Sequence, residues 1–136
     1  MRNIFLAVLL LIFGFAISAF AQQPLASADV IAIIGKGGKS DYDTRYFAVQ
    51  RLSRSLPDAD LKHYISFLAK LPEDDSLPES PLATIKNDVA DKLLAQQSLP
   101  EELPGLFLSL VDDPAQGIIW RDYVLQKYPE LMRRLP

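Results

Sequence analysis

The chain has 136 residues, a formal net charge of −3 and no cysteine. The length suits one small domain rather than a multidomain enzyme. Without cysteine, the sequence excludes disulfide staples, thiolate nucleophiles and thiolate metal sites. An acidic chain that lacks a long basic run also offers no electrostatic footprint for nucleic acid or for an anionic membrane surface.

The first 21 residues predict a signal peptide. Met1-Arg2-Asn3 is a short basic start, residues 4–16 are almost wholly apolar, and Ala19-Phe20-Ala21 has the small-x-small pattern that a signal peptidase accepts. Cleavage after Ala21 would leave residues 22–136 as a single domain, located in the periplasm or outside the cell if the source is bacterial. The alternative is a retained membrane anchor, because a stretch of about 18 apolar residues nearly spans a bilayer.

The rest of the sequence predicts an all-α protein. Apolar residues recur at steps of three and four, no sustained alternation of period two occurs, and prolines separate the periodic segments. The first segment reads either as a short buried helix or as a strand. Asp41 or Ser40 is the expected N-cap of the second helix, and Pro129 is expected to break or kink the last one. The helices are expected at about 27–35, 42–54, 58–71, 82–96, 101–111 and 117–133.

Two similar tetrapeptides mark expected helix starts. Ser55-Leu56-Pro57-Asp58 and Ser98-Leu99-Pro100-Glu101 each place a serine three residues before an acid. This spacing is that of a capping box, in which the serine accepts a backbone hydrogen bond and the acid reaches back to the serine amide. On this interpretation, Ser98→Ala would cost about 0.5–2 kcal/mol through loss of the cap.

Several features repeat at roughly 40 residues. Phe67-Leu68 recurs as Phe107-Leu108, and a basic residue followed three positions later by a small or branched apolar residue occurs at Arg45, Lys86 and Arg121. This period and the segment Lys86-Asn87-Asp88-Val89-Ala90-Asp91-Lys92-Leu93 resemble HEAT-type helical repeats. An irregular helical bundle is the alternative.

The resemblance implies three stacked helical hairpins over about residues 27–135. One phasing pairs 27–35 with 42–54, 58–71 with 82–96, and 101–111 with 117–133. The usual phasing of the family instead makes 42–71 and 82–111 the repeats, with a half repeat at each end. In either phasing, the resemblance implies a scaffold that binds another protein over an extended surface.

No motif predicts catalysis, a cofactor or a metal site. Residues 30–40 imitate a phosphate-binding loop, but a Walker loop requires glycine at the position that Ile33 occupies. His63 is the only histidine, and its neighbours at helical spacing, Ala59, Asp60, Ser66 and Phe67, supply no nucleophile in a cleft. The acidic stretch from Glu73 to Glu79 lacks the spacing of an EF-hand, and residues 72–81 are expected to form an exposed loop.

The largest concentration of aromatic residues lies near the end of the chain, at Trp120, Tyr123 and Tyr128, with Arg121 among them. Aromatic residues and arginine are favoured as interface anchors, so these four are the candidate partner-binding residues. Alternatively, Trp120 and Tyr123 close the core of the last hairpin. The sequence therefore favours an exported, non-enzymatic protein-binding scaffold, with a small periplasmic inhibitor or immunity protein, or an exported ligand carrier or enzyme, as alternatives.

Overall fold

The computed structural model describes residues 23–35 and 41–136. The predicted signal peptide and most of the glycine-rich loop lie outside this part of the chain. The described residues form six α-helices and one short 3-10 helix and contain no strand, which confirms the all-α prediction and rules out the strand alternative for the first segment. The elements are α1 (Ser27–Gly35), α2 (Tyr42–Gln50), α3 (Asp58–Leu68), η1 (Pro72–Asp74), α4 (Glu79–Leu94), α5 (Leu103–Asp112) and α6 (Ile118–Arg134).

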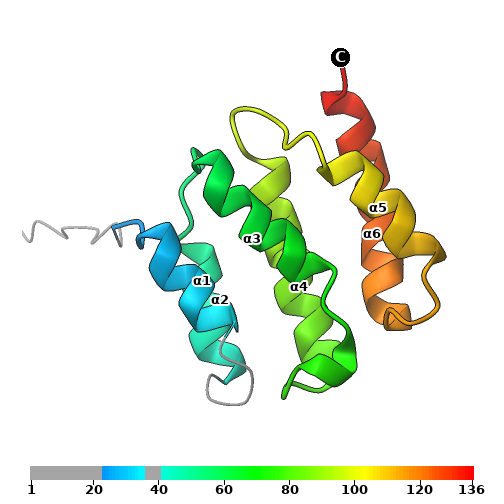
Figure 1. Ribbon diagram of the computed structural model, residues 1–136, viewed down its shortest axis with the longest axis horizontal. Helices are drawn as coiled ribbons and strands as arrows, with labels where there is room; N and C mark the ends of the chain where they lie inside the picture. The colour runs from blue at the N-terminus through cyan, green and yellow to red at the C-terminus, as the bar shows by residue number, and fades with distance from the viewer. Residues whose placement is uncertain (1–22, 36–40) are drawn as a thin grey trace, which may run out of the picture.

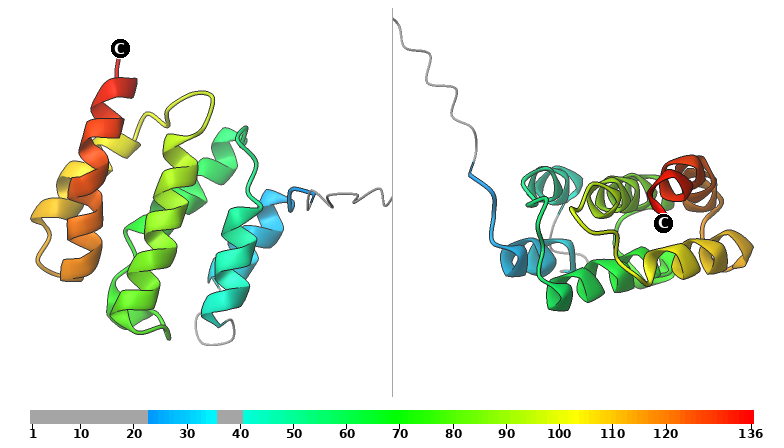
Figure 2. Two further views of the ribbon diagram at one scale, coloured as in Figure 1. Left: turned by 180° about the vertical axis from the view of Figure 1, so that it is seen from behind. Right: turned by 90° about the horizontal axis from the view of Figure 1, so that it is seen from above.

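The six helices form three hairpins. α1 packs on α2, α3 on α4, and α5 on α6, as in the first of the two expected pairings (Figure 1). The second helices of the hairpins, α2, α4 and α6, lie side by side in one layer, and α1, α3 and α5 form the other layer (Figure 2). Helix α4 is therefore the centre of the molecule, because α3 covers it from the other layer while α2 and α6 flank it.

The sequence of α4 suits this central position. Apart from the buried Lys86, its polar residues lie on an outer strip, while the rest of the helix surface is buried, as expected for a helix with neighbours on three sides. Ala83 and Ala90 are small, which allows neighbouring helices to approach closely. The buried residues of α4 are Leu82, Ala83, Ile85, Lys86, Val89, Ala90, Leu93 and Leu94.

The helix starts agree only in part with the sequence predictions. Asp41 is the N-cap of α2, as expected, and its Oδ1 accepts a hydrogen bond of 2.8 Å from the Thr44 amide. The two predicted capping boxes are wrong. Helix α3 begins after Pro57, helix α5 begins after Glu102, and neither start has a side-chain cap.

Proline explains why the serines do not cap these helices. A capping Ser55 would require Leu56 to be helical, but Pro57 disfavours a helical conformation in the residue before it. The Pro57 carbonyl instead accepts the first hydrogen bonds of α3, from Asp60 and Leu61. Leu99 stands in the same relation to Pro100, so α5 starts later than predicted.

Two further boundaries differ from expectation. Helix α2 ends at Gln50 rather than near residue 54, and α4 begins at Glu79 because Pro81 is accommodated within its first turn. Pro129 does not end α6, which continues to Arg134. The segment expected as an exposed loop before α4 contains η1 and one fully buried side chain, that of Asp75.

Candidate functional site

A buried ion pair links the first hairpin to the second. Arg45, in the first turn of α2, donates from Nη1 to both carboxylate oxygens of Asp75, at 3.0 and 2.9 Å, and both side chains are fully buried. Asp75 also accepts hydrogen bonds from Lys70 Nζ and from the Leu77 amide. Burial alone would raise the pKa of Asp75, but these hydrogen bonds lower it to about 2.

A second polar contact links the second hairpin to the third. Lys86, at the middle of α4, donates to the Lys70 carbonyl and, at 3.2 Å, to Gln116 Oε1. Gln116 is also buried, and its Nε2 donates to the Ala69 carbonyl at 2.9 Å. Burial lowers the pKa of Lys86 to about 8, although the negative charge of Asp75 acts in the opposite direction.

The two contacts occupy equivalent places in successive hairpins. In both, a basic residue of the second helix meets a polar residue thirty positions later, in the loop of the following hairpin. The third recurring basic residue, Arg121, donates from Nε to the Val111 carbonyl near the end of α5, at 2.8 Å. Cations near helix C-termini are favoured by the helix dipole. We assign a structural role to Arg45, Lys86 and Arg121.

The predicted partner-binding residues do not share one surface. Trp120 is 2% exposed, and its indole donates to the Leu68 carbonyl at 3.1 Å, so it belongs to the core. Arg121 is half-buried against α5, and the half-buried Tyr128 has a buried hydroxyl without a hydrogen-bond partner among the described residues. Only Tyr123 lines a groove on the surface.

This groove is one of two that flank α4 on the outer side of its layer. The groove between α4 and α6 has a volume of about 420 Å³ and is lined by residues that include Asp91, Tyr123 and Glu130. The groove between α2 and α4 has a volume of about 260 Å³ and includes Asp88 and Asp91. Because Asp91 lines both grooves, they form one continuous surface over α2, α4 and α6, which we call the grooved face.

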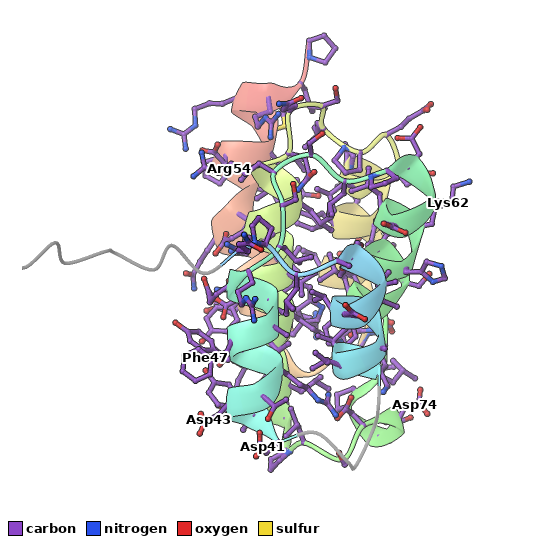
Figure 3. The ribbon with its side chains drawn as sticks, turned by 90° about the vertical axis from the view of Figure 1, so that its left-hand side faces the viewer. Asp41, Asp43, Phe47, Arg54, Lys62 and Asp74 are labelled. Atoms are coloured by element: carbon purple, nitrogen blue, oxygen red, sulfur yellow. The ribbon has the colours of Figure 1, made fainter. Side chains whose placement is uncertain are left out.

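Aromatic residues of α2 border the grooved face. Tyr42 stacks on Tyr46 with 6.0 Å between ring centroids, and Tyr46 meets Phe47 edge-on at 5.3 Å. Phe47 is 60% exposed. Figure 3 shows Phe47 on the α2 side of the molecule, opposite Lys62 of α3. The aromatic run was visible in the sequence, but its position beside the grooves depends on the packing of α2 against α4.

The acidic side chains of the grooved face have partners within the chain, as do its two lysines. Lys92 Nζ donates to the Gln50 carbonyl at 2.9 Å, Lys127 forms an ion pair with Asp91, and Glu130 forms one with Arg133. Asp88 accepts a long hydrogen bond of 3.4 Å from Gln50 and is also hydrogen-bonded by Asn87, and its pKa is raised by burial and by the nearby charge of Asp91. The exposed Arg54 adds a further basic side chain to the groove between α2 and α4.

The other chemical candidates do not assemble into a site. His63 lies exposed on α3, beside a groove of about 400 Å³ that contains Phe67 and Lys70. Within residues 23–35 and 41–136, no group of three side chains is placed to hold a metal ion. In the acidic stretch before α4, Asp75 points inward to Arg45, away from the exposed Glu73 and Asp74.

Comparison with known proteins gives no relative. No family model matches the chain, and no significant match was found among curated proteins or solved structures. Among the helices of the described segments, none has the length and hydrophobicity needed to cross a membrane.

Proposed function

We propose that this protein is an exported, non-enzymatic scaffold of HEAT-like hairpins that binds a segment of another protein on its grooved face. The observation that carries this proposal is the pair of connected grooves beside α4, bordered by the exposed Phe47. Grooves between parallel helices suit an extended chain, and aromatic residues at their edge provide apolar contact area.

The HEAT-like interpretation gains support from the interior of the protein. Arg45 and Lys86 are 41 residues apart, as are their partners Asp75 and Gln116. The spacing agrees with the period of HEAT-type repeats, which is about 40–47 residues. Equivalent contacts at equivalent places are expected where successive hairpins stack in the same way.

Export remains part of the proposal because the leader has all three regions of a signal peptide. A chain without cysteine has no disulfide to stabilise it outside the cytoplasm, so packing and buried polar contacts must hold the fold. The connections from Arg45 to Asp75 and from Lys86 to Gln116 meet that need between hairpins.

The charges of the grooved face indicate the chemistry of the partner segment. The grooves are lined by three acidic side chains, of Asp88, Asp91 and Glu130, and by three basic ones, of Arg54, Lys92 and Lys127. A bound segment should therefore carry charges of both signs together with apolar side chains, because complementary charge favours both rate and specificity of association.

Partner capture with matched variants tests this function. The wild-type protein should retain a defined protein from the exported fraction of its source. A variant with Phe47→Ser and Glu130→Lys should retain at least about tenfold less, since it loses an exposed apolar anchor and an attractive charge. His63→Ser, on the other layer, should bind like wild type. Equal retention by all three proteins, each with an unchanged circular dichroism spectrum, would refute the assignment of the grooved face.

A further inference from the structure

The outer side of α6 carries an apolar stripe that nothing covers within the described chain. Ile118, Leu125 and Met132 are 75%, 52% and 60% exposed. They are seven residues apart, so they lie on one side of the helix along nearly its whole length. Single exposed apolar residues are ordinary, but several large ones aligned on one side of a helix are typical of an interface.

This stripe lies on the side of α6 opposite to α4. Lys127 and Arg134 of α6 reach α4 and the loop that follows it, through Asp91 and the Gln96 carbonyl. At 100° per residue, Leu125 is on the other side of the helix from Lys127 and Arg134. The stripe thus lies at the free end of the row formed by α2, α4 and α6. It occupies the side of α6 that is equivalent to the side of α4 covered by α6.

The charge distribution along this end selects a second copy in antiparallel orientation. Beside the stripe, Asp122 lies toward the N-terminal end of α6 and Arg133 toward its C-terminal end, where Arg133 also pairs with Glu130 of the same helix. Arg134 is turned toward the loop after α4 and does not contribute. In an antiparallel pair of α6 helices, each acidic end lies beside a basic end. A parallel pair would place like charges together, which is unfavourable.

We propose that two copies of this chain associate through their α6 stripes, around a two-fold axis that passes near Leu125. Ile118 of one copy then packs near Met132 of the other, and Arg133 lies near the partner's acidic end. An antiparallel two-fold pair of this kind is isologous. Its axis runs perpendicular both to the row of helices and to the helices themselves. The grooved faces of both copies therefore point to the same side and form one surface of doubled length.

The test is the molar mass of the purified protein, produced from its full sequence in a secreting host and measured by light scattering from about 5 to 200 µM. We expect a concentration-dependent dimer. Leu125→Asp should remain monomeric over this range because it buries an unpaired charge in the stripe. Ala32→Asp, an exposed position of α1 in the first hairpin, should dimerise like wild type.

A charge exchange separates this arrangement from unspecific apolar association. Asp122→Arg and Arg133→Asp should each weaken the dimer by about fivefold or more, and the double variant should recover to within about threefold of wild type. All variants should keep the helical spectrum of the wild type. A wild-type protein that stays monomeric at the highest concentration, or an unaffected Leu125→Asp dimer, would overturn the proposal.

Discussion

Arg45 and Asp75 form a fully buried ion pair in which one guanidinium nitrogen lies within 3.0 Å of both carboxylate oxygens. The pair connects α2 of the first hairpin to the loop that precedes α4 of the second. Buried charges are costly unless they are paired and hydrogen-bonded, and Asp75 meets this condition through additional bonds from Lys70 and Leu77. The pair thus fixes how the first two hairpins are placed relative to each other.

Acid should destabilise the protein through Asp75. Its pKa is about 2 in the folded state, below the ordinary 3.8, so its contribution is fully present above pH 3.8 and is lost as the pH falls toward 2. The shift corresponds to about 2 kcal/mol. Urea unfolding at pH 5, 3.5 and 2.5 measures this loss.

The variant Asp75→Asn isolates the contribution of this carboxylate. It should lower the free energy of unfolding at neutral pH by about 3 kcal/mol or more, because Arg45 remains buried without its counter-charge. It should also have a smaller loss of stability between pH 5 and 2.5 than wild type. An identical acid dependence in both proteins would show that another group is responsible.

Alkali should stabilise the protein through Lys86. Its pKa is about 8 in the folded state and 10.5 ordinarily, so between these values the unfolded chain holds the proton that the folded chain has released. Stability must therefore rise with pH in this window, by about 2 kcal/mol between pH 8 and 9.5. The measurement stops at pH 9.5, before the tyrosines ionise. Lys86→Met should remove the rise, and a rise that persists in this variant would exclude Lys86 as its source.

Trp120 should contribute to stability through both its volume and its indole nitrogen. Trp120→Phe removes the hydrogen bond to the Leu68 carbonyl and replaces the indole near Lys86 Nζ, which lies 5.6 Å from the ring centroid, with a smaller phenyl ring. We expect a loss of about 2 kcal/mol for this change and about 3–5 kcal/mol for Trp120→Ala. Thermal or urea unfolding checks both values; a neutral Trp120→Ala would place this side chain on the surface.

Two variants distinguish the helix caps seen in the structure from those that the sequence motifs predict. Asp41→Ala should lower the melting temperature, because Asp41 Oδ1 accepts the Thr44 amide at the start of α2. Ser98→Ala should leave the melting temperature unchanged, since Ser98 is exposed and α5 has no side-chain cap. A lower melting temperature for Ser98→Ala, with no change for Asp41→Ala, would instead support the capping box predicted at Ser98.

The helices were predictable because their determinants are local. Apolar spacing at three and four residues and the placement of proline identified the last five helices, whereas the first segment read equally as a helix or a strand. Asp41 was one of two candidate caps, with Ser40. The serine motifs failed where a second local rule opposed the first. Leu56 and Leu99 each precede a proline, and this prevents the helical conformation that a serine cap would require.

The buried polar contacts were not predictable in the same way. Arginine, lysine and aspartate are expected at the surface, so the periodic pattern assigns Asp75 to an exposed acidic loop. Arg45 was noted as a recurring basic residue, but its partner thirty residues away is visible only after the hairpins are stacked. The two equivalent partners also differ in chemistry, aspartate in one hairpin and glutamine in the next, so no shared motif marks them.

The candidate site required the packing as well. Trp120 stood out by its chemistry, yet its orientation on α6 places it in the core. Tyr123, three residues later, lines the groove beside Asp91 because α4 and α6 lie side by side. Residue type alone therefore could not separate the buried side of α6 from its grooved side.

Site-specific photo-crosslinking tests the central claim that the grooved face binds a partner. A photoreactive residue at Gln126, which lines the groove between α4 and α6, is compared with the same residue at His63, which lies exposed on α3. We expect the photoreactive residue at Gln126 to form a defined adduct in the exported fraction of the source. Excess unmodified protein should reduce this adduct, and the photoreactive residue at His63 should not form it. An equal or stronger adduct from His63, or no adduct from Gln126, would contradict the claim.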